Sequence, residues 1–146
     1  MRIALVVSRY NAFVTDRLEA GARATLADAG VASSSIETFA VPGAFELAQA
    51  ASRLAQSGEW SAVVCLGCLI RGETPHFEYI ADATASGIMR AAQDTGVPIA
   101  FGVLTTNTAE EAIARAGEGE TNKGREAATA ALDMARLYER IDRNGA

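Results

Sequence analysis

Residues 2–7 read Arg-Ile-Ala-Leu-Val-Val, an almost unbroken apolar run with the length of one β-strand. Neighbouring side chains point to opposite sides of a sheet, so a strand of this kind must bury both of its faces. Parallel sheets achieve this by covering each face with helices. Polar residues 8–11 follow at once, so we expect neither a signal peptide nor a membrane span here.

Three further strands are predicted along the chain, over residues 36–41, 62–66 and 99–104. Helical spacing of apolar residues predicts helices over residues 15–29, 45–56, 75–95, 109–116 and 124–140, and Thr108 with Glu111 forms a capping-box pattern. This alternation predicts a flavodoxin-like, three-layer α/β/α sandwich with a mainly parallel sheet of four to five strands. No linker interrupts it, so we expect one domain over residues 1–146.

Composition excludes several classes of function. The chain has a formal net charge of −5 and no cluster of Lys or Arg, whereas nucleic-acid binding requires grouped cations. With no clustered cations and no long apolar stretch, we expect a protein that binds neither nucleic acid nor membrane. Cys65 and Cys68 are too few for a secreted disulfide framework, so we also expect a cytoplasmic protein. The two residues have the spacing of a redox pair, but such a pair opens a helix and Cys65 lies within a predicted strand, which favours two buried thiols. No residues have the spacing of metal ligands.

The strand-to-helix turns hold the residues best suited to chemistry. In a parallel sheet the carboxyl ends of the strands share one edge, and ligands bind there. The turns at this edge cover residues 8–11, 41–46, 67–76 and 105–107. His76, the only histidine, ends the third turn. Histidine both takes and gives protons near neutral pH, so we predict that His76 transfers protons, with a packing or capping role as the alternative.

Other side chains near this edge suit a planar, anionic ligand. Thr74 lies in a loop that leads into a helix, and such a helix start can hold a phosphate. Tyr10 and Phe45 lie in ligand-edge turns and could stack on a heterocycle, although core packing is the alternative. Arg115 and Lys123 flank a polar loop and could hold a dianion or simply complement helix ends.

The loops together closely resemble those of lumazine synthases. The matching segments are residues 41–46 (Val-Pro-Gly-Ala-Phe-Glu), 66–79, 101–106 (Phe-Gly-Val-Leu-Thr-Thr), 112–117 and 122–124 (Asn-Lys-Gly). They follow one another in order along nearly the whole chain. The resemblance is therefore to the family itself and not only to a shared fold.

This resemblance implies a transferase of the penultimate step of riboflavin biosynthesis. In that step 5-amino-6-(D-ribitylamino)uracil condenses with L-3,4-dihydroxy-2-butanone 4-phosphate to give 6,7-dimethyl-8-ribityllumazine and phosphate. Imine formation, phosphate elimination and ring closure need proton transfer and anion binding, and they need neither a metal nor an organic cofactor. Holding the two substrates in contact supplies much of the acceleration.

The resemblance also implies a role for individual residues. It makes His76 the catalytic residue, and Tyr10 the side chain that stacks on the pyrimidine. In this family Phe101, Arg115 and Lys123 come from the adjacent subunit, so the active site needs a homopentamer. The implied substrate-binding residues are Tyr10, Asn11, Ala44, Phe45, Glu46, Cys68, Leu69, Ile70, Glu73, Thr74, Phe101, Arg115 and Lys123, of which Glu73, Thr74 and Arg115 take the phosphate.

The chain departs from the family pattern at two places. Glu73 stands where a small residue is common. Many relatives have an additional N-terminal strand that pairs with a neighbouring subunit, whereas this sequence starts directly at its first predicted core strand. The higher assembly is therefore left open among a pentamer, a pair of pentamers and a sixty-subunit shell. A flavin-binding or storage relative with weak catalysis is the alternative function. Receiver domains and flavodoxins share the topology, but the turns at residues 8–11 and 67–68 lack their acidic or hydroxyl-rich residues.

Overall fold

A computed structural model describes residues 1–145, and these form a parallel sheet between two layers of helices. The strands are β1 (Ile3–Ser8), β2 (Ile36–Val41), β3 (Ala62–Ile70) and β4 (Ile99–Thr106). They lie in the order β2-β1-β3-β4, and every neighbouring pair is parallel. The predicted α/β/α sandwich is confirmed, with four strands in the described part of the chain.

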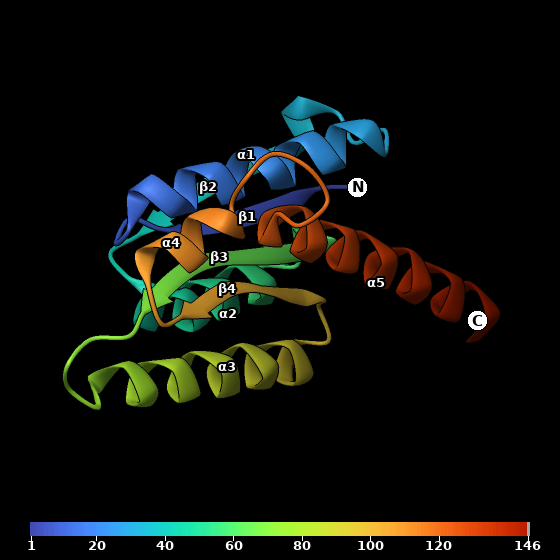
Figure 1. Ribbon diagram of the computed structural model, residues 1–146. Coiled ribbons are helices and arrows are strands. Elements are labelled where there is room, and N and C mark those ends of the chain that lie inside the picture. Colours follow the sequence, from blue (N-terminus) through green and yellow to red (C-terminus); the bar gives the residue numbers. More distant parts are fainter. Residues whose placement is uncertain (146) are drawn as a thin grey trace.

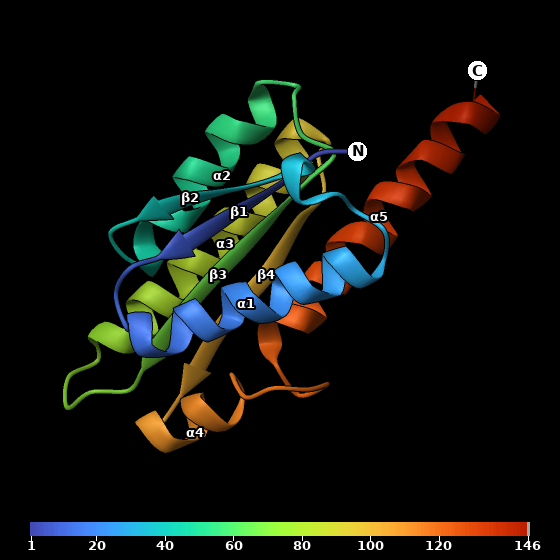
Figure 2. The same ribbon diagram turned by 90° about the horizontal axis from the view of Figure 1, so that it is seen from above.

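Five α-helices cover the sheet within residues 1–145. They are α1 (Ala12–Asp28), α2 (Leu47–Gln56), α3 (His76–Thr95), α4 (Ala109–Ala114) and α5 (Lys123–Gly145), with short 3-10 turns at Ser33–Ser35 and Ala44–Glu46. Helices α1 and α5 lie on one face and α2 and α3 on the other, and the end of α5 extends beyond the sheet (Figures 1 and 2). None of these described helices is long and apolar enough to cross a membrane.

The apolar run that starts the chain is buried on both faces, as predicted. Ile3, Leu5 and Val7 pack with α1 and α5 in one cluster. Ala4 and Val6 pack with α2 and α3 in the other. Burying an aliphatic side chain of this size stabilises the fold by about 1.5–3 kcal/mol, so the two clusters hold all three layers together.

Two strands are longer than their sequence patterns indicated. The predicted ends at residues 66 and 104 are wrong, because residues 67–70 of β3 continue to pair with residues 103–106 of β4. Gly67 was taken as the start of a turn, but it lies within the strand. A Cβ atom there would come within 2.9 Å of the Leu47 side chain, so the absence of a side chain serves packing. The connections at the ligand edge therefore shrink to residues 71–75 and 107–108.

Helix boundaries differ from the predictions by a few residues. Helix α1 begins at residue 12 instead of 15, and α5 continues to residue 145 instead of ending near 140. Helix α4 ends at residue 114. Its start is capped as predicted, because the Thr108 side chain accepts a hydrogen bond from Glu111 N at 3.1 Å. The Glu111 carboxylate in turn accepts a hydrogen bond from Asn107 N at 3.0 Å, one residue earlier than a capping box requires.

Candidate functional site

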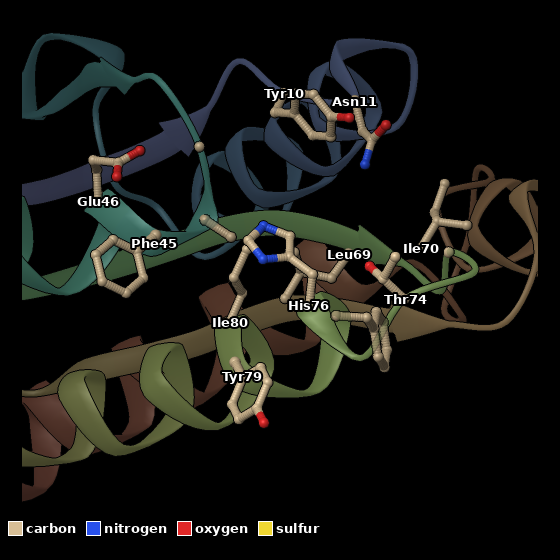
Figure 3. Close-up of a pocket in the computed structure, with 14 residues that line it drawn as sticks. Tyr10, Asn11, Phe45, Glu46, Leu69, Ile70, Thr74, His76, Tyr79 and Ile80 are labelled. Atoms are coloured by element: carbon tan, nitrogen blue, oxygen red, sulfur yellow. The ribbon is translucent and has the colours of Figure 1, made fainter.

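A hollow of about 780 Å³ lies at the carboxyl ends of the strands, at the predicted ligand edge (Figure 3). Most of the predicted site residues line it. They are Tyr10, Asn11, Ala44, Phe45, Glu46, Leu69, Ile70, Thr74 and His76. These residues come from the turn after β1, the turn after β2 and the segment from the end of β3 to the start of α3, which the parallel order of the strands brings to one place.

The turn between β1 and α1 is held in an unusual backbone conformation by Asn11. Its φ of 64° and ψ of 44° lie in the left-handed region, which asparagine tolerates better than most residues. Its side-chain amide donates a hydrogen bond to Cys68 O on β3 at 2.9 Å. Tyr10 N also donates to Pro42 O at 3.2 Å. Because the turn is tied on both sides, Tyr10 is held at the hollow with 68% of its surface exposed.

The 3-10 turn Ala44–Glu46 forms another wall of the hollow. Ala44 is buried, and its carbonyl oxygen accepts a hydrogen bond from the Thr84 hydroxyl of α3 at 3.4 Å. Phe45 next to it is 57% exposed, which is unusual for a phenylalanine. A buried anchor followed by an exposed ring gives the hollow a second aromatic face besides Tyr10.

The loop that leads to His76 is fastened by Arg71. Its guanidinium donates hydrogen bonds to Glu78 Oε1 at 2.8 Å and to Asn107 Oδ1 at 3.0 Å, and it lies 4.8 Å from the centre of the Phe77 ring. His76 is the first residue of α3, and its imidazole points into the group of labelled side chains (Figure 3). His76 is exposed and lines the hollow, so its imidazole is accessible to a ligand there.

Tyr79 and Ile80 also line the hollow, although the sequence analysis did not select them. Both follow His76 at helical spacing of three and four residues, so all three share one face of α3. That spacing was a usable signal, because a helix that places His76 at a site must place these neighbours there as well.

A second hollow, of about 370 Å³, lies beside β4. It contains the other predicted residues Phe101, Arg115 and Lys123, and it shares no lining residue with the first hollow. Arg115 is exposed, and Lys123 Nζ lies 3.3 Å from Glu126 Oε1. A single copy of the chain therefore separates the cations from His76 and from the aromatic faces.

Cys68 and Glu73 line neither hollow. Glu73 is exposed in the loop before His76. The Cys68 side chain is 1% exposed and packs in the core under α1 and α5, while Cys65 packs on the opposite face of β3. The prediction of two buried thiols is confirmed. Burial raises the pKa of the Cys65 thiol to about 12 and that of Cys68 to about 11, because the thiolate loses its water.

Among residues 1–145, no group of three or more His, Cys, Asp and Glu side chains is placed to hold a metal ion. The chemistry that the described residues can provide is proton transfer at His76, stacking on Tyr10 and Phe45, and anion binding at Arg115 and Lys123.

Comparison with known proteins identifies close relatives. Residues 1–139 match the family described as 6,7-dimethyl-8-ribityllumazine synthase. The chain is 50% identical over 140 residues to the 6,7-dimethyl-8-ribityllumazine synthase of Stenotrophomonas maltophilia (strain R551-3), covering 96% of this chain and 90% of that protein. Identity to the enzyme of the same name from Syntrophus aciditrophicus is 50% over 141 residues, covering 97% and 92%. For the Salinibacter ruber protein of that name it is 48%, covering 97% and 90%.

Proposed function

The chain belongs to the 6,7-dimethyl-8-ribityllumazine synthase family, and we propose that its two hollows are the two halves of that enzyme's active site, joined between neighbouring copies. The reaction condenses 5-amino-6-(D-ribitylamino)uracil with L-3,4-dihydroxy-2-butanone 4-phosphate in riboflavin biosynthesis. The observation that carries the proposal is the separation of His76 from Arg115 and Lys123 into hollows with no residue in common.

The larger hollow takes the pyrimidine. Tyr10 and Phe45 offer exposed aromatic faces on which its ring stacks. Its other residues, Asn11, Ala44, Glu46, Leu69 and Ile70, bind the polar atoms of the ring and the ribityl chain. One hydrogen of Asn11 Nδ2 is donated to Cys68 O, which leaves Oδ1 and the second Nδ2 hydrogen to the substrate. Cys68 contributes indirectly, because its side chain is buried and its carbonyl oxygen holds the Asn11 side chain in place.

The smaller hollow takes the phosphate of the ketone. Arg115 provides a planar guanidinium that can bind two phosphate oxygens at once, and Lys123 adds a second positive charge. Phe101 lies beside them and packs against the pyrimidine bound to the neighbouring copy. Thr74 and Glu73, at the start of α3 in the facing copy, offer backbone N–H groups to the same phosphate.

His76 carries protons between the two substrates. The amine must lose a proton as it attacks the ketone, and the departing water and phosphate must gain protons. An exposed imidazole that lines the hollow can take a proton in one step and give it back in another. Because the remaining acceleration comes from holding two reactants together, the loss of His76 slows the reaction without abolishing it.

Joining the halves requires a ring of subunits. The surfaces that meet are different parts of the chain, so the contact is head-to-tail, and such contacts close into rings. Helices α3 and α5 offer a surface for it beside the edge strand β4, where Met89, Phe101, Met134 and Tyr138 are exposed around an apolar hollow. The family resemblance sets the number of copies at five. We propose the homopentamer on these grounds, with each chain acting as one domain in the reducing cytoplasm, where free thiols persist.

A direct assay tests this function. Purified protein mixed with both substrates should form the fluorescent lumazine and release one phosphate, and omission of either substrate should stop both signals. His76→Ala should lower kcat and keep the assembly intact in light scattering. Arg115→Ala should raise the KM for the phosphorylated ketone and leave pyrimidine binding unchanged. A protein that scatters light as a monomer and still turns over at full rate would reject the shared site.

A further inference from the structure

The link between α4 and α5 is organised by one buried side chain, Asn122. It is 3% exposed, and it stands directly before the first residue of α5. Its Oδ1 accepts hydrogen bonds from Gly124 N at 2.8 Å and Arg125 N at 3.1 Å, so it caps the helix. An ordinary N-cap residue is exposed and does no more than this, so burial indicates an additional role.

The additional role belongs to the amide nitrogen. The two hydrogens of Asn122 Nδ2 are shared among three acceptors, Ala116 O at 3.2 Å, Gly117 O at 3.0 Å and Arg17 O of α1 at 3.2 Å. Two of these carbonyls belong to the residues directly after Arg115. One side chain therefore ties the end of the α4 segment, the start of α5 and the middle of α1 together.

Two glycines make room for this arrangement. A Cβ atom at Gly21 of α1 would collide with the Asn122 side chain, and one at Gly124 of α5 would collide with Leu18 O. Helices α1 and α5 therefore approach closely only because both positions lack a side chain. The Asn122 side chain occupies the space that a side chain at Gly21 would need.

The tie bears directly on the two cations of the smaller hollow. Arg115 directly follows α4 and precedes Ala116, and Lys123 directly follows Asn122. Lys123 N donates to Arg115 O at 2.9 Å, which brings the backbones of the two cationic residues together across the loop. The side chain of Asn122 links the residues next to both cations, because it bonds to Ala116 and Gly117 after Arg115 and to Gly124 and Arg125 after Lys123.

We propose that Asn122 is a positioning residue, whose buried amide fixes Arg115 and Lys123 at the separation that the phosphorylated ketone requires. It touches no substrate and acts through those two residues. The inference rests on the phosphate-binding role proposed above for Arg115 and Lys123, and it adds a residue that pocket lining alone does not reveal, because Asn122 does not line the hollow with the cations.

Asn122→Asp tests the proposal, because a carboxylate still accepts from Gly124 N and Arg125 N but cannot donate to the three carbonyls. We expect a rise of about tenfold in the KM for the phosphorylated ketone, the effect of losing about 1.4 kcal/mol, with the KM for the pyrimidine unchanged. Binding of inorganic phosphate should weaken by the same factor. Asn122→Ser keeps a capping oxygen without the added charge, and it should behave alike if the carboxylate prevents folding.

A double-mutant cycle with Arg115→Ala separates positioning from general destabilisation. If Asn122 acts through Arg115, adding Asn122→Asp to Arg115→Ala should raise the ketone KM much less than it does alone. Leu132→Ala, a core truncation further along α5, is the control: it should lower the unfolding temperature and leave the ketone KM unchanged.

Two results would overturn the inference in distinguishable ways. An unchanged ketone KM in both Asn122 variants, with Arg115→Ala raising it, would reject positioning by Asn122 and leave the phosphate site standing. An unchanged ketone KM in Arg115→Ala would reject the phosphate site itself, and the role of Asn122 with it.

Discussion

Two variants that are each impaired when the ketone is limiting should regain part of the lost activity when they assemble together. His76→Ala damages the larger hollow, and Arg115→Ala damages the smaller one. If each active site combines the larger hollow of one copy with the smaller hollow of the next, a mixed ring contains some sites with both halves intact. If one chain supplied both halves, every site would carry one of the two changes, and mixing would restore nothing.

The size of the recovery follows from the geometry. In rings assembled at random from equal amounts of the two variants, half of the chains offer an intact His76 and half of the following neighbours offer an intact Arg115. About a quarter of the sites are then fully wild-type, whatever the number of subunits in the ring. At other mixing ratios this fraction equals the product of the two chain fractions, so activity plotted against ratio is a parabola with its maximum at equal amounts.

The assay is product fluorescence from rings purified after co-expression of the two variants with different tags. Co-expression of Arg115→Ala with Lys123→Ala is the matched control, because both changes lie in the same half and no mixed site is intact. Recovery of about a quarter in the first pair and none in the control supports the shared site. Equal, low activity in both pairs, with mixed rings verified by both tags, would refute it.

Three further predictions follow from single residues. Tyr10→Ala should raise the KM for the pyrimidine about tenfold, as loss of a stacking partner worth 1–3 kcal/mol requires, while Tyr10→Phe should stay near wild type in the same steady-state assay. Gly124→Ala should destabilise the fold by about 3 kcal/mol in urea titration, because its Cβ would collide with Leu18 O. Gly117→Ala, whose Cβ would lie 3.8 Å from the nearest atom, should be nearly neutral, and equal losses would contradict the packing argument. Stability should fall above about pH 9, by about 1.4 kcal/mol per pH unit for each buried thiol, since an unfolded thiol ionises there while the pKa of folded Cys65 is raised to about 12. Cys65→Ala should lower this slope but not abolish it, because Cys68 is also buried with a raised pKa, and an unchanged slope would assign the loss to other groups.

Boundaries were the least accurate part of the prediction from sequence. The strand pattern placed the end of β3 at residue 66, because Gly67 resembles the start of a turn. The structure continues β3 to Ile70, since β4 supplies partners for each added residue. The end of a strand depends on its pairing with segments that are distant in the sequence. The residues next to the strand end carry no information about that pairing.

Asn11 and Asn122 illustrate the same limit at the site. Asn11 was expected to bind substrate, and the structure adds a backbone strain and a hydrogen bond to Cys68 O that hold the turn. Asn122 was seen only as part of a matching motif. Its five side-chain hydrogen bonds join segments as far apart as Arg17 and Gly124, and no spacing along the chain indicates that they meet.

Continuous apolar runs were enough to predict the parallel sheet, the helices on both faces and the sheet edge that carries His76. This information is local, because the period and composition of a segment record how many of its faces are buried. The separation of Arg115 and Lys123 from His76, and the close approach of α1 and α5 at Gly21 and Gly124, came only from the folded chain. Both features depend on contacts between segments that are distant in the sequence. Such contacts are determined by the packing of the whole molecule, so no single stretch of sequence predicts them.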